Sequence, residues 1–137
     1  MISNPKYGWC DFKIEDNDNN IFFGTPSYTT NVPVDLLDAF VQYYEKGEGL
    51  IWLDEEGEGG FSFVLTPYTT YILEERDNEI LHKISIPVRE LAKELIEDIE
   101  SDLDRWAKFC CEFDDIDSID ENKEIMLAYI YRLKRYI

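Results

Sequence analysis

The sequence predicts an α+β protein in which a single antiparallel sheet of about five or six strands is packed by three helices, the last two of them C-terminal. Three observations lead to this class. Segments that alternate bulky and polar residues fill much of the first 86 residues, one helical segment interrupts them, and two amphipathic segments follow. Strands followed by helices are typical of α+β proteins. The 137 residues carry no linker or repeat, so residues 1–137 are expected to form one domain.

The first strands are predicted at residues 8–14 and 21–23, with the polar run 15–20 as the turn of a hairpin. A helix is predicted to start after Pro33 and to end at Gly47. Proline suits the first turn of a helix, and glycine suits the position that follows its end.

Four further strands are predicted in the middle of the chain, at residues 50–53, 61–65, 68–73 and 80–86. An acidic, glycine-rich turn joins the first two. Pro67 precedes the third, so that connection is expected to be a bulge or to lie at a sheet edge.

Two C-terminal helices are predicted. The longer one covers about residues 88–113, because its apolar side chains fall on one side at helical spacing. The shorter one begins at Ser118, since Glu121 follows at the spacing of a capping box. Asp102 falls within the apolar side of the long helix. We expect it at the helix edge, or paired with a buried group such as a tyrosine hydroxyl or an arginine.

Charge excludes several kinds of partner. The chain has 13 Lys+Arg against 30 Asp+Glu, which gives a net charge of −17. Nucleic acids and anionic membrane surfaces are bound through Lys and Arg, so neither is expected as a direct partner.

Residues 1–7 lack the pattern of a secretory signal, and the odd count of cysteines (Cys10, Cys110, Cys111) favours reduced, buried thiols. We therefore expect a cytoplasmic protein.

The sequence predicts no catalytic residue, no metal site and no cofactor. The only histidine, His82, lies mid-strand on an apolar face and is expected to be a satisfied core residue. Residues 16–20 begin like a calcium-binding loop, but Ile21 stands where that loop needs glycine and Ser27 where it needs its closing glutamate. The glycines of residues 57–60 lack the Lys-Ser/Thr of a phosphate-binding loop.

The acidic residues are densest at two places, which we predict as the partner-binding sites. A solvated surface is the simplest explanation of a charged run. However, solubility needs a net charge of only about 2–8 in a small domain, and self-repulsion destabilises the fold. A basic protein partner would explain the excess, because opposite charge speeds association. Trp9 and Trp52 face either the core or a partner. The predicted contact residues are Asp54, Glu55, Glu56 and Glu58 in the turn, and Glu97, Asp98, Glu100 and Asp104 on the long helix.

Four segments resemble small acidic immunity proteins of bacterial toxin–immunity systems, including those of contact-dependent growth inhibition. They are residues 8–12 (GWCDF), 32–40 (VPVDLLDAF), 54–57 (DEEG) and 98–103 (DIESDL). The resemblance implies a cytosolic, non-enzymatic inhibitor. Such a protein binds its cognate toxin domain, often a nuclease, and blocks the active site or an adjacent surface.

Three other functions remain open at this point. An acidic protein can mimic nucleic acid and occupy the basic groove of a DNA-processing protein, which requires carboxylates spaced like phosphates. A small enzyme can use carboxylates in a cleft, which requires carboxyl groups with perturbed pKa values. The chain can also be a subunit or adaptor of a larger complex.

Overall fold

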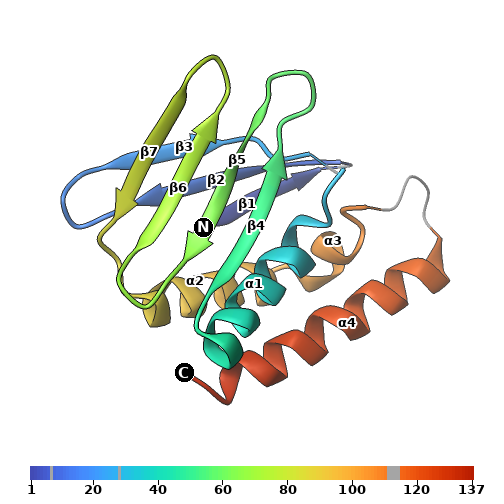
Figure 1. Ribbon diagram of the computed structural model, residues 1–137. Helices are drawn as coiled ribbons and strands as arrows, with labels where there is room; N and C mark the ends of the chain where they lie inside the picture. Colours follow the sequence, from blue (N-terminus) through green and yellow to red (C-terminus); the bar gives the residue numbers. More distant parts are fainter. Residues whose placement is uncertain (7, 28, 111–114) are drawn as a thin grey trace.

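The computed structural model describes residues 1–6, 8–27, 29–110 and 115–137, and over these residues the chain is α+β, as the sequence predicts. A three-stranded antiparallel sheet has the order β1-β2-β3, and a four-stranded one has the order β4-β5-β6-β7. The helices lie together on one side of the four-stranded sheet (Figure 1). The strands are β1 (Ile2–Lys6), β2 (Trp9–Glu15), β3 (Ile21–Gly24), β4 (Gly49–Asp54), β5 (Gly60–Leu65), β6 (Thr70–Glu75) and β7 (Glu79–Ile84). The helices are α1 (Val32–Lys46), α2 (Val88–Glu100), α3 (Leu103–Ala107) and α4 (Ile116–Lys134).

The prediction of a single sheet is wrong, because the strands form two separate hydrogen-bonded sheets. The segment after β3 leaves the first sheet and meets the end of β4, where the Ser27 backbone N–H donates to the Asp54 carbonyl at 2.8 Å. The two sheets then pack through their inner faces, with the Phe12 and Phe61 rings 5.0 Å apart and the Phe22 and Phe61 rings 4.8 Å apart. Alternation marks the buried face of a strand but not its neighbour, so it could not separate one sheet from two.

The strand β1 was not predicted. Asn4 at its centre has a positive φ of 52°, and the β1–β2 register shifts between Ser3 and Lys6. This irregularity breaks the alternation that identifies a strand. The connection at Pro67 is neither a bulge nor a sheet edge. It is the β5–β6 turn, organised by the Thr66 hydroxyl, which donates to the Thr69 carbonyl at 2.8 Å.

The first helix is confirmed. Pro33 lies in the first turn of α1, and Gly47 ends it with a left-handed φ of 90° while its N–H donates to the Tyr43 carbonyl. Such a φ favours glycine. Leu36 and Phe40 are fully buried on the face that meets the sheet, where the Phe40 and Phe63 rings lie 5.8 Å apart.

The long helix predicted over residues 88–113 is interrupted. α2 ends at Glu100, Asp102 has a non-helical φ of −153°, and α3 follows at Leu103. The break turns the chain so that Trp106 is buried while its indole N–H donates to the Asp98 carbonyl at 3.1 Å. Asp102 lies at the element edge, 40% exposed, with its carboxylate 3.5 Å from the Arg105 guanidinium. Residues 111–113 and the thiol of Cys111 lie outside the described residues.

The predicted start of the last helix is also wrong. α4 starts one turn earlier than Ser118, because the Asp115 carboxylate accepts the backbone N–H groups of Asp117 and Ser118. α4 packs along α1, and Met126, Ile130 and Leu133 are its buried side chains. Ile125 of the same helix is exposed, at 36%. Within the described part of the chain, no helix combines the length and apolar character that a bilayer span requires.

Candidate interaction surface

The acidic turn between β4 and β5 contains one carboxylate that is structural. Glu55 is only 3% exposed, and it accepts from Arg76 Nε at 2.6 Å, Arg76 Nη2 at 2.9 Å and the Thr25 backbone N–H at 2.9 Å. The hydrogen bond that Arg76 donates to Glu55 is the main cause of the raised pKa of Arg76. Arg76 also donates to the Phe23 carbonyl of β3 at 3.0 Å. Glu55 therefore joins the two sheets and is withdrawn from any contact with a partner.

His82 belongs to the same network. Its Nε2 lies 2.9 Å from Glu74 Oε2, while Glu74 Oε1 accepts from Arg76 Nη1 at 2.8 Å. The bond with His82 is the first cause of the lowered pKa of Glu74. The imidazole packs edge-to-face against the Phe22 ring, with ring centroids 5.1 Å apart. His82 thus has a partner, as expected, but it is half-buried on the edge strand β7 rather than enclosed in the core.

Of the other acids of this turn, Glu56 and Glu58 are exposed and Asp54 is half-buried, and acids of the neighbouring β6–β7 turn join them. Within the described residues, Asp54 has the only carboxylate of this group with a hydrogen-bond partner, the Thr29 hydroxyl at 3.0 Å, and none of these carboxylates has an ion pair. The strand register brings Asp54, Glu75 and Glu79 into one row across the sheet. We call this group the acid rim: Asp54, Glu56, Glu58, Glu75, Asp77 and Glu79.

The acid rim was only half predicted. Its first three members come from the turn that the sequence singled out. The members on β6 and β7 are far along the chain from Asp54, and only the pairing of four strands places them beside it. An even spacing of hairpin turns is the one sequence signal that could have indicated this neighbourhood.

The helix acids predicted as a contact site are mostly neutralised within the chain. The Asp98 carboxylate accepts from the Met1 amino group at 2.6 Å, Glu100 lies 3.0 Å from Lys134, and Asp104 lies 2.7 Å from Lys123. The hydrogen bond from Lys123 is the main cause of the lowered pKa of Asp104. Glu97 is exposed on α2. The helix break also separates Asp104 from the other three, so the structure does not assemble these acids into one face.

Two of the three rows on the outer face of the four-stranded sheet are largely apolar. Register places Trp52, Ser62, Leu73 and Leu81 in one row across it, and Leu50, Val64, Tyr71 and Lys83 in the next. Leu50 is 64% exposed, Trp52 is 41% and Leu81 is 57%. Trp9 is exposed on the other sheet, whereas Trp106 is buried in the core, as its position on the apolar side of the long helix predicts.

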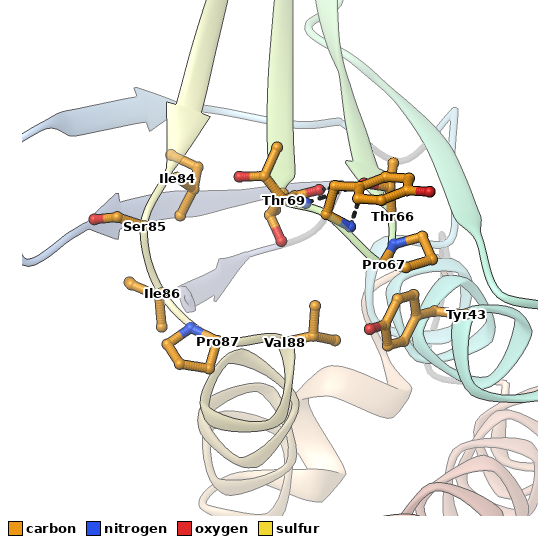
Figure 2. Close-up of a pocket in the computed structure, with 11 residues that line it drawn as sticks. Tyr43, Thr66, Pro67, Thr69, Ile84, Ser85, Ile86, Pro87 and Val88 are labelled. Atoms are coloured by element: carbon orange, nitrogen blue, oxygen red, sulfur yellow. Dashed lines mark hydrogen bonds between the residues drawn. The ribbon is translucent and has the colours of Figure 1, made fainter.

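The cavity between the β5–β6 turn and the start of α2 offers little to a catalytic reaction. It has a volume of about 300 Å³ and is lined by Tyr43, residues 66–70 and residues 84–88 (Figure 2). No carboxylate or histidine lines it, and the Thr66 hydroxyl is occupied by the backbone of its own turn. The Thr70 hydroxyl has no hydrogen-bond partner among the described residues, but Thr70 is only 1% exposed, so a molecule in the cavity would not reach it.

The loop that resembles a calcium site is closed on itself. Asp16 is buried, and its carboxylate accepts the backbone N–H groups of Asp18, Asn20 and Ser85 at 2.9 to 3.2 Å. No group of three or more His, Cys, Asp or Glu side chains suited to a metal ion occurs within the described ranges.

Comparisons with known proteins return nothing for this chain: no family model, curated protein or solved structure matches it.

Proposed function

We propose that this protein is a non-enzymatic inhibitor that binds a basic toxin domain through the acid rim and neutralises it in the cytoplasm. One observation carries the proposal. Six carboxylates from two neighbouring turns lie together and none of them forms an ion pair among the described residues, because Arg76 of the second turn is paired with Glu55 and Glu74; the acids of α2 and α3 are largely paired. Glu56 and Glu58 are exposed at the tip of the β4–β5 turn, where a partner has free access.

The physical benefit of such a rim is fast and selective association. Clustered charge of one sign steers an oppositely charged partner and repels acidic proteins. A nuclease that binds nucleic acid carries a basic surface, so it fits this rim. The resemblance to immunity proteins supports the same class of partner.

The proposal is tested by capture followed by a growth assay. The tagged protein is captured from the cells that produce it, washed at low and at high salt, and its partners are identified by mass spectrometry. We expect a basic protein in near-equal amount that is retained less at high salt. Expressed alone in a susceptible host, that protein should arrest growth, and co-expression of the chain should restore growth.

A pair of charge-matched variants tests the role of the acid rim. Glu56→Lys/Glu58→Lys should slow association with the captured protein by roughly tenfold or more at low salt and flatten its salt dependence. Glu121→Lys/Glu124→Lys on the exposed side of α4 changes the net charge equally and should have little effect. Equal slowing by both variants would refute the acid rim as the contact. A captured protein that does not harm the host, or no captured protein, would refute toxin neutralisation.

A further inference from the structure

The four-stranded sheet departs from the usual pattern of a solvated sheet. An antiparallel sheet with one face in water carries apolar residues inward and polar residues outward. Here the inward row of Ile51, Phe63 and Ile72 is buried as expected. Two of the three outward rows are nevertheless also largely apolar. Their apolar members are Leu50, Trp52, Val64, Tyr71, Leu73 and Leu81.

No described element covers this outer face. Figure 1 shows the three-stranded sheet and the helices behind and below the β4–β7 sheet. The Phe12, Phe22 and Phe40 rings all pack on its inner side, against Phe61 or Phe63. Contiguous exposed apolar residues of this kind mark an interaction site more often than single exposed ones.

Trp52, the largest side chain of this face, is held in place before any partner binds. A Cβ placed on Gly60 would lie 2.6 Å from the Trp52 ring, so the indole rests directly over this glycine. A tryptophan held in place loses little conformational entropy on binding, and tryptophan is enriched among the residues that dominate interface energies.

The charge next to the apolar rows identifies the kind of occupant. The third outward row contains Asp54, Glu75 and Glu79, which are members of the acid rim, and the face has one cation among its described residues, Lys83. A second copy of the chain would bring the same acidic row and a net charge of −17 to the contact. An anionic membrane or a nucleic acid would meet the same repulsion.

We infer that the outer face of the β4–β7 sheet is the apolar centre of a protein interface whose acidic edge is the acid rim. Its occupant is a protein with an apolar patch bordered on one side by Lys and Arg. This inference rests on the proposed function and specifies the contact surface. The acid rim then sets the association rate, and the apolar rows set the dissociation rate.

Photo-crosslinking in the producing cells tests the surface. p-Benzoylphenylalanine replaces Leu81 on β7, Glu58 in the acid rim, or Leu127 on the exposed side of α4, which is 44% exposed and serves as the control. We expect adducts from positions 81 and 58 with the same basic protein, and none from position 127. The crosslinked peptide should contain apolar residues next to Lys or Arg.

A matched pair of double variants then tests the energetics. Leu50→Ser/Leu81→Ser removes two exposed side chains of the face. It should raise the rate of dissociation from the partner identified by crosslinking at least tenfold, and should leave the association rate within about twofold of the wild-type value. Ile116→Ser/Leu127→Ser removes two exposed apolar side chains of α4 and should change neither rate. Sedimentation of the wild-type protein alone should show a monomer.

Each contrary outcome has a distinct meaning. An adduct from position 81 with a second copy, or a dimer that Leu50→Ser/Leu81→Ser dissociates, would overturn the inference in favour of self-association. An adduct with an acidic protein, or unchanged kinetics in the double variant, would overturn it too. Adducts from position 58 but not 81 would refute the face while leaving the proposed function standing. No adduct from any position would refute both.

Discussion

At the scale of single residues, identical side chains in one turn have different roles. Glu55 and Glu56 are neighbours in sequence, yet the first is buried against Arg76 and the second is exposed. Burying an unpaired carboxylate is costly, so Glu55 is tolerated only because a guanidinium and two further donors reach it. Composition alone counts both residues equally as acids of the turn.

Asp16 is the second residue whose role depends on its contacts. Burial on its own raises the pKa of this carboxyl. The hydrogen bonds from Asn20, Ser85 and Asp18 outweigh burial and lower its pKa from 3.8 to about 2. Because Ser85 follows β7, this carboxylate ties the β2–β3 turn to the other sheet.

This shift predicts a pH-dependent contribution to stability. The pKa of Asp16 is lower in the folded than in the unfolded chain, so its contribution is present above about pH 3.8 and is lost as the pH falls toward about 2. Asp16→Asn should reduce the dependence of the free energy of unfolding on pH in that range. The measurement is urea denaturation at a series of pH values.

Asp18→Asn is the control for this prediction. Asp18 lies in the same turn and is exposed. This variant should keep the pH dependence of the wild type. If the free energy of unfolding of Asp16→Asn depended on pH as strongly as that of the wild type, the role given to Asp16 would be contradicted.

At the scale of elements, caps and interruptions decide where the helices lie. The capping-box spacing of Ser118 and Glu121 is present in the sequence, but the aspartate one turn earlier caps α4. The apolar side chains predicted on one side of the long helix are mostly buried where the chain is described, yet the chain breaks at Asp102. A local pattern marks which side chains are apolar, and packing decides whether one straight helix can bury them all.

The cap of α4 supports a direct test. Asp115→Ala removes the acceptor for two backbone N–H groups at the start of α4 and should lower the free energy of unfolding by about 1 kcal/mol. Ser118→Ala removes only a hydroxyl that donates to Asp115, which should cost less than about half as much. Urea denaturation of both variants gives the comparison. A greater loss in Ser118→Ala would instead support the capping box.

At the scale of the whole molecule, two sheets share one core. Phe12 of β2 is fully buried and contacts Phe22 on its own sheet and both Phe61 and Phe63 on the other. The Glu55–Arg76 pair joins the same two sheets at one end. These contacts link the two sheets, so we expect the sheets to unfold together.

A substitution at this junction should therefore weaken both sheets together. Phe12→Ala should lower the free energy of unfolding by about 3–5 kcal/mol, the usual cost of deleting a buried aromatic side chain. Tryptophan fluorescence and far-ultraviolet circular dichroism should report one coincident urea transition.

Phe23→Ala provides the matched control. Phe23 lies on the neighbouring strand of the same sheet but faces outward, at 51% exposure. Its loss should therefore change the free energy of unfolding by no more than about 0.5 kcal/mol. Two separate transitions in Phe12→Ala would contradict a shared core.

The sequence alone determined the α+β class, six of the seven strands, the first helix and the acidic turn after β4. These depend on residues close together in the chain, where side-chain spacing, proline, glycine and charge act directly. It did not determine the number of sheets, the helix break or the membership of the acid rim.

Only the tertiary structure decided which acids are available and which sheet face is open. Glu55 meets Arg76 across 21 residues, and Asp98 meets the Met1 amino group across 97. Glu79 joins Asp54 only through the pairing of four strands. Such contacts depend on how the whole chain closes on itself, because electrostatic pairing and burial act through distance in space, and no local pattern in the sequence encodes that distance.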